Sequence, residues 1–229
     1  MMEADASHRR ELKDDRLIEV FVGKQVDPYL LSGRTLKVAS PFFERAIRDA
    51  DEEDEEPGVL RFPEDHESAW KVLLYFITTG SLPPEVTKLQ PQVDDMSTQQ
   101  LLAVRCWAMG EKYMLPKFQD SVMWILLHWL DHGSLYLAAI KEAFCTVSSG
   151  CGLWQLAAEE LAISVAHGST KYSALEEFCG IEGFISSFSF ALRNAPVDPG
   201  LHHESMEQRL ILYRAAQRRV EGLAEEEQA

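Results

Sequence analysis

The strand-like segments of this sequence all lie within its first 62 residues, and the remainder has the spacing of helices. Residues 17–23 are β-branched and aromatic and end at a glycine, and residues 26–31 and 59–62 also read as short strands. Beyond Phe62, apolar residues recur at helical spacing, as at Trp70, Leu73 and Ile77. The order predicts an α+β fold of short strands packed with helices, followed by an all-α region.

Serine, proline and glycine residues mark the ends of the predicted helices. Ser40 is expected to cap a helix that begins at the following proline, and Gly80 to end the helix before it. A capping-box pattern predicts that the next helix begins after Ser97, and Pro116 begins its partner. Further helices are expected over about 134–147, 152–167, 173–192 and 204–224.

The negative charge of the chain is concentrated in one short run. The sequence has 22 Lys and Arg against 37 Asp and Glu, a net charge of −15, and residues 49–56 alone contribute −7. Carboxylates so close together repel one another, which predicts a solvated connector. A solubilising loop is the favoured interpretation, and an electrostatic strip for a basic partner is the alternative. The strip would comprise Asp51, Glu52, Glu53, Asp54, Glu55 and Glu56.

The composition indicates which classes of partner and which cellular compartment to expect. An acidic chain without a basic motif is not expected to bind nucleic acid or an anionic membrane directly. No apolar run reaches the ~18–20 residues of a membrane span, and the first residues lack the apolar core of a secretory signal. We therefore expect an intracellular protein of the cytoplasm or nucleus. The four cysteines form no C-x-x-C pair, so reduced and mostly buried thiols are expected.

No catalytic or cofactor-binding constellation is evident. The sequence contains no Gly-x-Ser-x-Gly elbow, no phosphate-binding Gly-x-x-x-x-Gly-Lys motif and no dinucleotide fingerprint. His128 and His132 are spaced to share one helical face, but a third ligand is missing unless the pair His202-His203 supplies it. The prediction is a non-enzyme without cofactor or metal; a metal-binding protein or an enzyme is the distant alternative.

Four short motifs occur in a characteristic order over the first half of the chain. They are Leu36-Lys37-Val38-Ala39-Ser40-Pro41-Phe42-Phe43, Leu60-Arg61-Phe62-Pro63-Glu64-Asp65, the helix from Trp70 to Gly80, and the segment Ala108 to Phe118 with its Lys112-Tyr113 pair. In this order and spacing, residues 17–130 resemble a BTB/POZ domain of the type found in many fungal proteins. Helical C-terminal regions commonly follow such domains.

The sequence departs from the family pattern on its second strand. BTB domains usually carry a valine-histidine pair where this chain has Leu31-Ser32, so the hydrogen bonds of that histidine must be absent or replaced. Gly33 follows in place of a basic or polar residue, and the charged pocket of some transcriptional BTB domains is not expected. The resemblance implies a BTB/POZ domain over 16–132 with an acidic connector at 49–58. The residue pattern predicts a disordered tail over 1–15, a helical region over 133–224 and an acidic tail over 225–229.

The resemblance also implies a function in protein–protein interaction. BTB domains commonly self-associate, which predicts a homodimer, and many serve as substrate adaptors of cullin-based ubiquitin ligases; a regulatory oligomeriser without a ligase, for example one linked to transcription, is the alternative. The predicted dimer face is Leu17, Val20, Phe21, Leu36 and Phe42, with Phe43 assigned to the core. The predicted partner-binding residues are Phe62, Glu64, Tyr113, Met114 and Leu115.

The last predicted helix carries the main basic cluster of the chain. Met206, Leu210 and Tyr213 begin a series with alternating spacings of four and three residues, and arginines such as Arg209 and Arg214 lie outside it. A short coiled-coil arm would have this spacing. Packing of this helix onto the preceding helices is the favoured interpretation.

Overall fold

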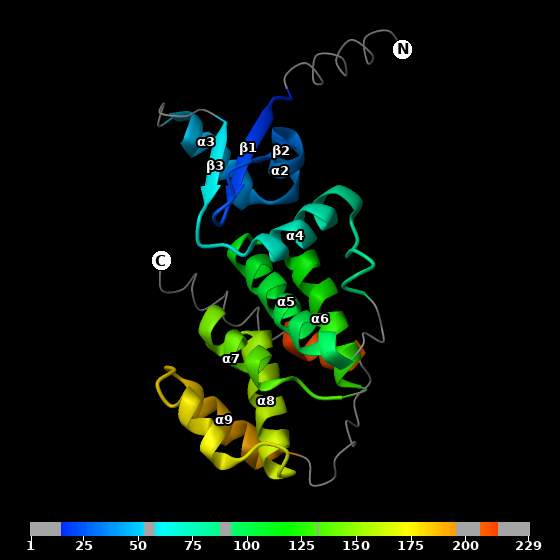
Figure 1. Ribbon diagram of the computed structural model, residues 1–229, viewed down its shortest axis with the longest axis vertical. Coiled ribbons are helices and arrows are strands. Elements are labelled where there is room, and N and C mark those ends of the chain that lie inside the picture. The colour runs from blue at the N-terminus through cyan, green and yellow to red at the C-terminus, as the bar shows by residue number, and fades with distance from the viewer. Residues whose placement is uncertain (1–14, 53–57, 88–92, 132, 196–206, 215–229) are drawn as a thin grey trace. The chain divides into compact units, whose positions relative to one another are not determined.

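The computed structural model describes residues 15–52, 58–87, 93–131, 133–195 and 207–214 (Figure 1). These residues form two compact units, one of residues 1–83 with 112–115 and one of residues 84–111 with 116–229. Together they make a small three-stranded mixed sheet near the N-terminus followed by a mainly helical region. The tails predicted at 1–15 and 225–229 lie outside the described residues, except for Asp15, and the division predicted at residue 132 stays a prediction.

The first unit is built on a three-stranded sheet of order β2-β1-β3. The central strand β1 (Leu17–Val22) runs antiparallel to β2 (Tyr29–Ser32) and parallel to β3 (Val59–Phe62). Strand β1 alternates between exposed and buried positions, with Ile18, Val20 and Val22 all fully buried. Each such side chain contributes about 1.5–3 kcal/mol by leaving water, so this alternation fixes which face of the sheet meets the helices.

Among the described residues of the first unit, the sheet is accompanied by the helices α2, α3 and α4 (Figure 1). Helix α2 (Gly33–Ala39) contacts β2 and α4 (Glu67–Thr79), and α3 (Pro41–Glu52) contacts α2 and β3. The Phe42 N–H donates to Ser40 Oγ over 3.0 Å, which confirms the predicted cap of α3. Gly80 ends α4 in the left-handed conformation (φ 74°), also as predicted.

The regular secondary structure in the described residues of the second unit is helical. It contains α5 (Val93–Lys112) up to Glu111, α6 (Pro116–Leu130), α7 (Leu137–Thr146), α8 (Gly152–Ala166), a 3-10 helix η1 (Tyr172–Phe178) and α9 (Phe184–Asn194), and residues 207–214 are also helical. Helix α8 contacts both α7 and α9. Phe144, Trp154, Phe178 and Phe184 form an aromatic core between these elements.

Three predicted boundaries are wrong. Helix α5 begins at Val93, so Ser97 lies inside it and caps nothing. The single helix predicted over 173–192 is the 3-10 helix η1 followed by α9, because the chain turns at Gly183 with a positive φ of 77°. The second strand begins at Tyr29, three residues after the predicted start. No helix among the described residues is long and apolar enough to cross a membrane.

Candidate functional site

The four motifs that carry the resemblance meet in the first unit around one carboxylate, Asp65. Their contacting members come from the start of α3, the end of β3, the loop before α4, α4 itself and the segment after α5. We call this group the Asp65 cluster. It consists of Ser40, Phe42, Phe43, Phe62, Asp65, Trp70, Lys112 and Tyr113.

The Asp65 carboxylate receives three side-chain donors. Trp70 Nε1 donates to Oδ2 over 2.6 Å, Lys112 Nζ binds Oδ1 over 2.7 Å, and the Tyr113 hydroxyl also donates to Oδ2. The Asp65 side chain is only 6% exposed. Such a buried charge is tolerable because it has a cationic partner and hydrogen-bond donors, and removing one partner would leave it costly to bury.

Aromatic rings surround these hydrogen bonds. Phe62 stacks on Trp70 with ring centroids 5.0 Å apart, and Phe43 stacks on Tyr113 at 5.2 Å. Phe42 meets the Tyr113 ring edge-on at 4.9 Å. Each such pair adds about 0.5–1.5 kcal/mol beyond the area it buries. The rings therefore hold four separate segments of the chain in one arrangement.

Tyr113 is the residue that joins the most parts of the cluster. Its hydroxyl binds Asp65, its ring contacts four other rings, and its carbonyl oxygen accepts a hydrogen bond from Ser40 Oγ. Burial, reinforced by the hydrogen bond to the Asp65 carboxylate, raises the pKa of Tyr113 well above its usual range. The hydroxyl is therefore a permanent donor and has no acid–base role near neutral pH.

The predicted partner-binding residues divide by exposure. Tyr113 is fully buried and Leu115 is 6% exposed, so both serve the core of the single chain. Phe62 is partly buried in the Asp65 cluster. Glu64 is exposed, and Met114 is 49% exposed on a backbone with a positive φ of 54°. Glu64 and Met114 are therefore the members of this set with the most accessible surface.

The predicted dimer face divides in the same way. Val20 and Leu36 are fully buried within the chain, whereas Leu17 is 62% exposed. Phe21 is partly covered by the Arg61 guanidinium, which lies 4.4 Å from the centre of its ring. Phe42 is partly exposed, and Phe43 is buried, in agreement with its assignment to the core.

The outer face of the sheet carries an apolar residue that the sequence analysis missed. Leu30 pairs with Glu19 across β1 and β2 and is 59% exposed. Directly paired residues lie on one face of a sheet, and Leu17 lies two residues before Glu19. Leu17, Phe21 and Leu30 thus share the face turned away from the buried side. The alternation of β1 gave a signal for Leu17 and Phe21, but the register of β2 was needed to add Leu30.

The acidic strip is only partly described. Glu53, Asp54, Glu55 and Glu56 lie outside the described residues. Glu52 ends α3 and is exposed, and Asp51 forms an ion pair with Arg16, at the start of β1. At least one of the strip's carboxylates therefore has a partner within the first unit.

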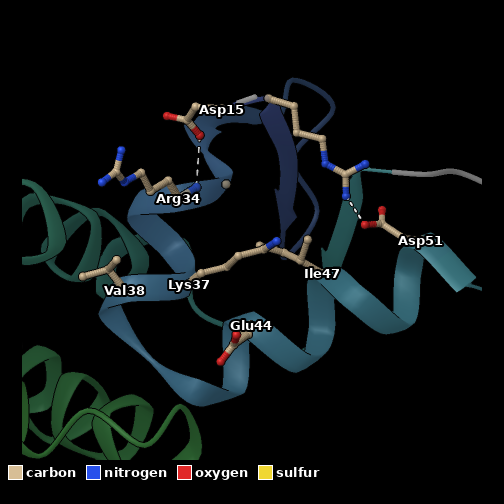
Figure 2. A pocket seen from close by; sticks show the side chains of 9 residues that line it. Asp15, Arg34, Lys37, Val38, Glu44, Ile47 and Asp51 are labelled. Atoms are coloured by element: carbon tan, nitrogen blue, oxygen red, sulfur yellow. Dashed lines mark hydrogen bonds and ion pairs between the residues drawn. The ribbon is translucent and has the colours of Figure 1, made fainter. Parts of the chain in front are cut away.

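A shallow cleft of about 610 Å³ lies beside α2 and α3 in the same unit (Figure 2). It is lined by Asp15, Arg16, Gly33, Arg34, Lys37, Val38, Glu44, Ile47 and Asp51. Asp15 accepts hydrogen bonds from the Ser32 hydroxyl (2.6 Å) and the Arg34 backbone N–H (3.0 Å), which lower its pKa. The charges expected to be missing with Gly33 are thus supplied by its neighbours, and they balance in sign.

The metal and thiol predictions concern residues of the second unit. His128 stacks on Trp124 at 5.5 Å, and His132, His202 and His203 lie outside the described residues. The described residues contain no group of three or more metal-binding side chains. All four cysteines are free; Cys106 and Cys151 are buried, whereas Cys145 and Cys179 are exposed, contrary to the expectation of mostly buried thiols. Burial raises the pKa of Cys151 to about 12.

No protein-family model, curated protein or solved structure matches the chain in comparisons with known proteins. The function must therefore be argued from the geometry described above.

Proposed function

We propose that this chain is a protein–protein interaction module of the BTB/POZ type, acting as a self-associating adaptor or scaffold rather than as an enzyme. The observation that carries the proposal is the convergence of its four sequence motifs on Asp65. Motifs that merely recurred by chance would have no reason to share one set of contacts, whereas here each contributes at least one ring or hydrogen bond.

The departure on the second strand also has a structural explanation that supports the proposal. Ser32 stands where the family usually has histidine, and its hydroxyl donates to Asp15 and accepts from the Thr35 backbone N–H at 3.1 Å. The latter hydrogen bond caps α2. The strand-to-helix turn therefore keeps a side chain that fixes it, although that side chain is a different one.

Self-association is proposed through the outer face of the sheet and its surroundings. Leu17 and Leu30 are large apolar side chains, each more than half exposed in the single chain. Exposed apolar side chains on one face can form an interaction site, and two-fold dimers use one self-complementary patch on both copies. Of the predicted dimer face, Leu17, Phe21 and Phe42 keep accessible surface for this role.

Light scattering of the purified full chain tests this proposal. We expect a dimer at tens of micromolar that Leu17→Glu converts to a monomer, because a charge would be buried at the interface. Val26→Glu is the matched control, since Val26 is 86% exposed and lies in the turn after β1. A wild-type chain that is monomeric at this concentration would contradict self-association.

Recruitment of substrates to a cullin-based ubiquitin ligase is the more specific form of the proposal. The accessible pair Glu64 and Met114 provides the surface for it. A regulatory oligomeriser without a ligase is the alternative, since the exposed Leu17 and Leu30 require only self-association.

A further inference from the structure

The helical residues 207–214 lie against α6 and α8 with their polar side inward. Arg209 and Tyr213 are 4% and 6% exposed, whereas Ile211 and Leu212 are 61% and 53% exposed. An amphipathic helix that covers a protein core normally turns its apolar side inward. The orientation of this segment is therefore determined by its charged and aromatic contacts.

These contacts are made to four carboxylates of α6, the residue after it and α8. Arg214 binds Asp120 through a hydrogen bond from Nε to Oδ1 and an ion-pair contact between Nη2 and Oδ2, each 2.7 Å long. The Tyr213 hydroxyl donates to Glu159 over 2.8 Å. Arg209 forms ion pairs with Asp131 and Glu160. We call Asp120, Asp131, Glu159 and Glu160 the acidic docking surface.

The segment satisfies this surface incompletely. Both ion pairs of Arg209 are 3.8 Å long, beyond hydrogen-bond distance. Glu160 Oε1 and Arg209 Nη1 are buried without hydrogen-bond partners, and the Glu160 side chain is only 5% exposed. Unmet buried polar groups weaken the contact that buries them. A ligand whose guanidinium lay within hydrogen-bond distance of Glu160 would therefore bind this surface more tightly than the described segment does.

We propose that the acidic docking surface binds an arginine-bearing helix of a partner protein, and that residues 207–214 occupy the surface in cis when that partner is absent. The matching chemistry is one guanidinium and one aromatic hydroxyl on the inward face of a helix, with a second guanidinium at its edge, spaced as Arg209, Tyr213 and Arg214 are. The bidentate contact at Asp120 favours arginine over lysine, since only a guanidinium offers two parallel donors. Displacement would also carry the exposed Ile211 and Leu212 away from this surface together with the rest of the segment.

A labelled synthetic peptide of residues 204–224 is the probe for this site. It is titrated into the full-length chain and into the full-length variant Arg209→Ala/Arg214→Ala, whose own segment can no longer hold the surface. We expect the variant to bind the peptide at least tenfold more tightly than the wild type, because a cis competitor raises the apparent Kd. Adding Asp120→Asn and Asp131→Asn to the variant should abolish binding. Arg193→Ala, on the exposed end of α9, is the control for loss of an arginine away from this surface.

Three results would contradict the proposal. One is equal affinity of the wild type and the double variant, and another is equal binding of a peptide with both arginines replaced by alanine. The third is a wild-type dimer that the peptide converts to monomers, which would make a second copy of this chain the occupant. Circular dichroism and the unfolding midpoint establish that each variant is folded.

Gly152 allows a second test that leaves all these charges intact. A Cβ atom there would lie 2.7 Å from the Tyr213 carbonyl oxygen, so Gly152→Ala should push the segment away. We expect amide hydrogen exchange to accelerate at least tenfold in residues 207–214 and to stay unchanged in α7. Gly180→Ala is the control, since its Cβ would meet nothing within 4 Å. Unchanged exchange, or exchange accelerated equally in α7, would show that the segment is an integral part of the fold, and the proposal would be wrong.

Discussion

A single carboxylate organises the part of this chain that carries its family resemblance. Asp65 follows β3 in sequence, yet its donors come from α4 and from residues 112 and 113, nearly fifty positions away. Hydrophobic contact alone would leave the three segments free to slide, whereas a buried carboxylate with three directed donors permits one arrangement. This explains why a Pro-Glu-Asp end to the strand and a Lys-Tyr pair after the helix occur together.

Glu160 is the buried acid of the second unit that should give the fold a pH dependence. Burial raises its pKa from 4.5 to about 7; Arg209 opposes this rise and Glu159 adds to it. The folded state therefore keeps a proton that the unfolded chain releases near pH 4.5. Because the folded state binds more protons between these two values, the free energy of unfolding falls as pH rises from about 4.5 to 7, by about 3 kcal/mol.

Replacement of this acid tests the linkage. Glu160→Gln keeps the size and shape of the side chain but does not titrate. The fall of about 3 kcal/mol in the free energy of unfolding between pH 4.5 and 7 should therefore be absent from this variant. Urea unfolding of both proteins at a series of pH values measures the difference. Glu182→Gln, at an exposed position, should retain the wild-type profile. Parallel profiles for wild type and Glu160→Gln would show that Glu160 has the same proton affinity in both states.

At the level of elements, short sequence signals predicted the strand and helix boundaries that depend on interactions between neighbouring residues. Strand β1, the start of α3 and the end of α4 were predicted from β-branched and aromatic content, a serine cap and a glycine, respectively. The start of α5 was predicted wrongly because serine occurs both as a helix cap and inside helices. Ser97 lies inside α5, since the helix begins four residues earlier, at Val93. Asp94 and Asp95 gave a competing signal, since acidic residues favour a first helical turn.

The crossing of α5 and α6 leads to a prediction at this scale. A Cβ atom on Gly110 would lie 2.4 Å from Gln119 Cγ and 3.3 Å from a ring carbon of Phe118. Gly-to-Ala changes inside a helix normally stabilise it by about 0.5–1 kcal/mol. Both neighbours are buried here, so Gly110→Ala should instead lower the free energy of unfolding by about 1–3 kcal/mol.

Denaturant unfolding measures this change, with Gly133→Ala as the control. The Cβ of that variant would have its nearest neighbour at an ordinary 3.9 Å. A stabilised Gly110→Ala protein would mean that the two helices separate at little cost. The close approach could not be predicted from the sequence, because a glycine within a helix indicates a crossing only once the partner helix is placed.

For the whole molecule, the sequence motifs included the residues of the Asp65 cluster but did not indicate what each residue contacts. Phe62, Tyr113 and Leu115 were assigned to a partner surface, yet Tyr113 and Leu115 are core residues and Phe62 stacks on Trp70. A motif shows that residues act together, but it does not show whether they face a partner or one another. Exposure decides that question, and it depends on contacts between segments far apart in sequence.

This distinction determines how the ligase hypothesis should be tested on the full chain. A substitution at Phe62 or Leu115 would disturb the core and would abolish binding whatever the true surface is. Met114 is exposed beside the Asp65 cluster, and its sulfur accepts from Arg45 at the surface, so Met114→Glu changes the proposed contact without opening the core.

If the chain is a cullin adaptor, it should co-purify with the cullin scaffold, and Met114→Glu should reduce recovery at least tenfold. Ile185→Glu, 60% exposed on α9, should leave recovery unchanged. Equal recovery of both variants would place the contact elsewhere, and a wild-type chain that recovers no cullin would favour the scaffold without a ligase.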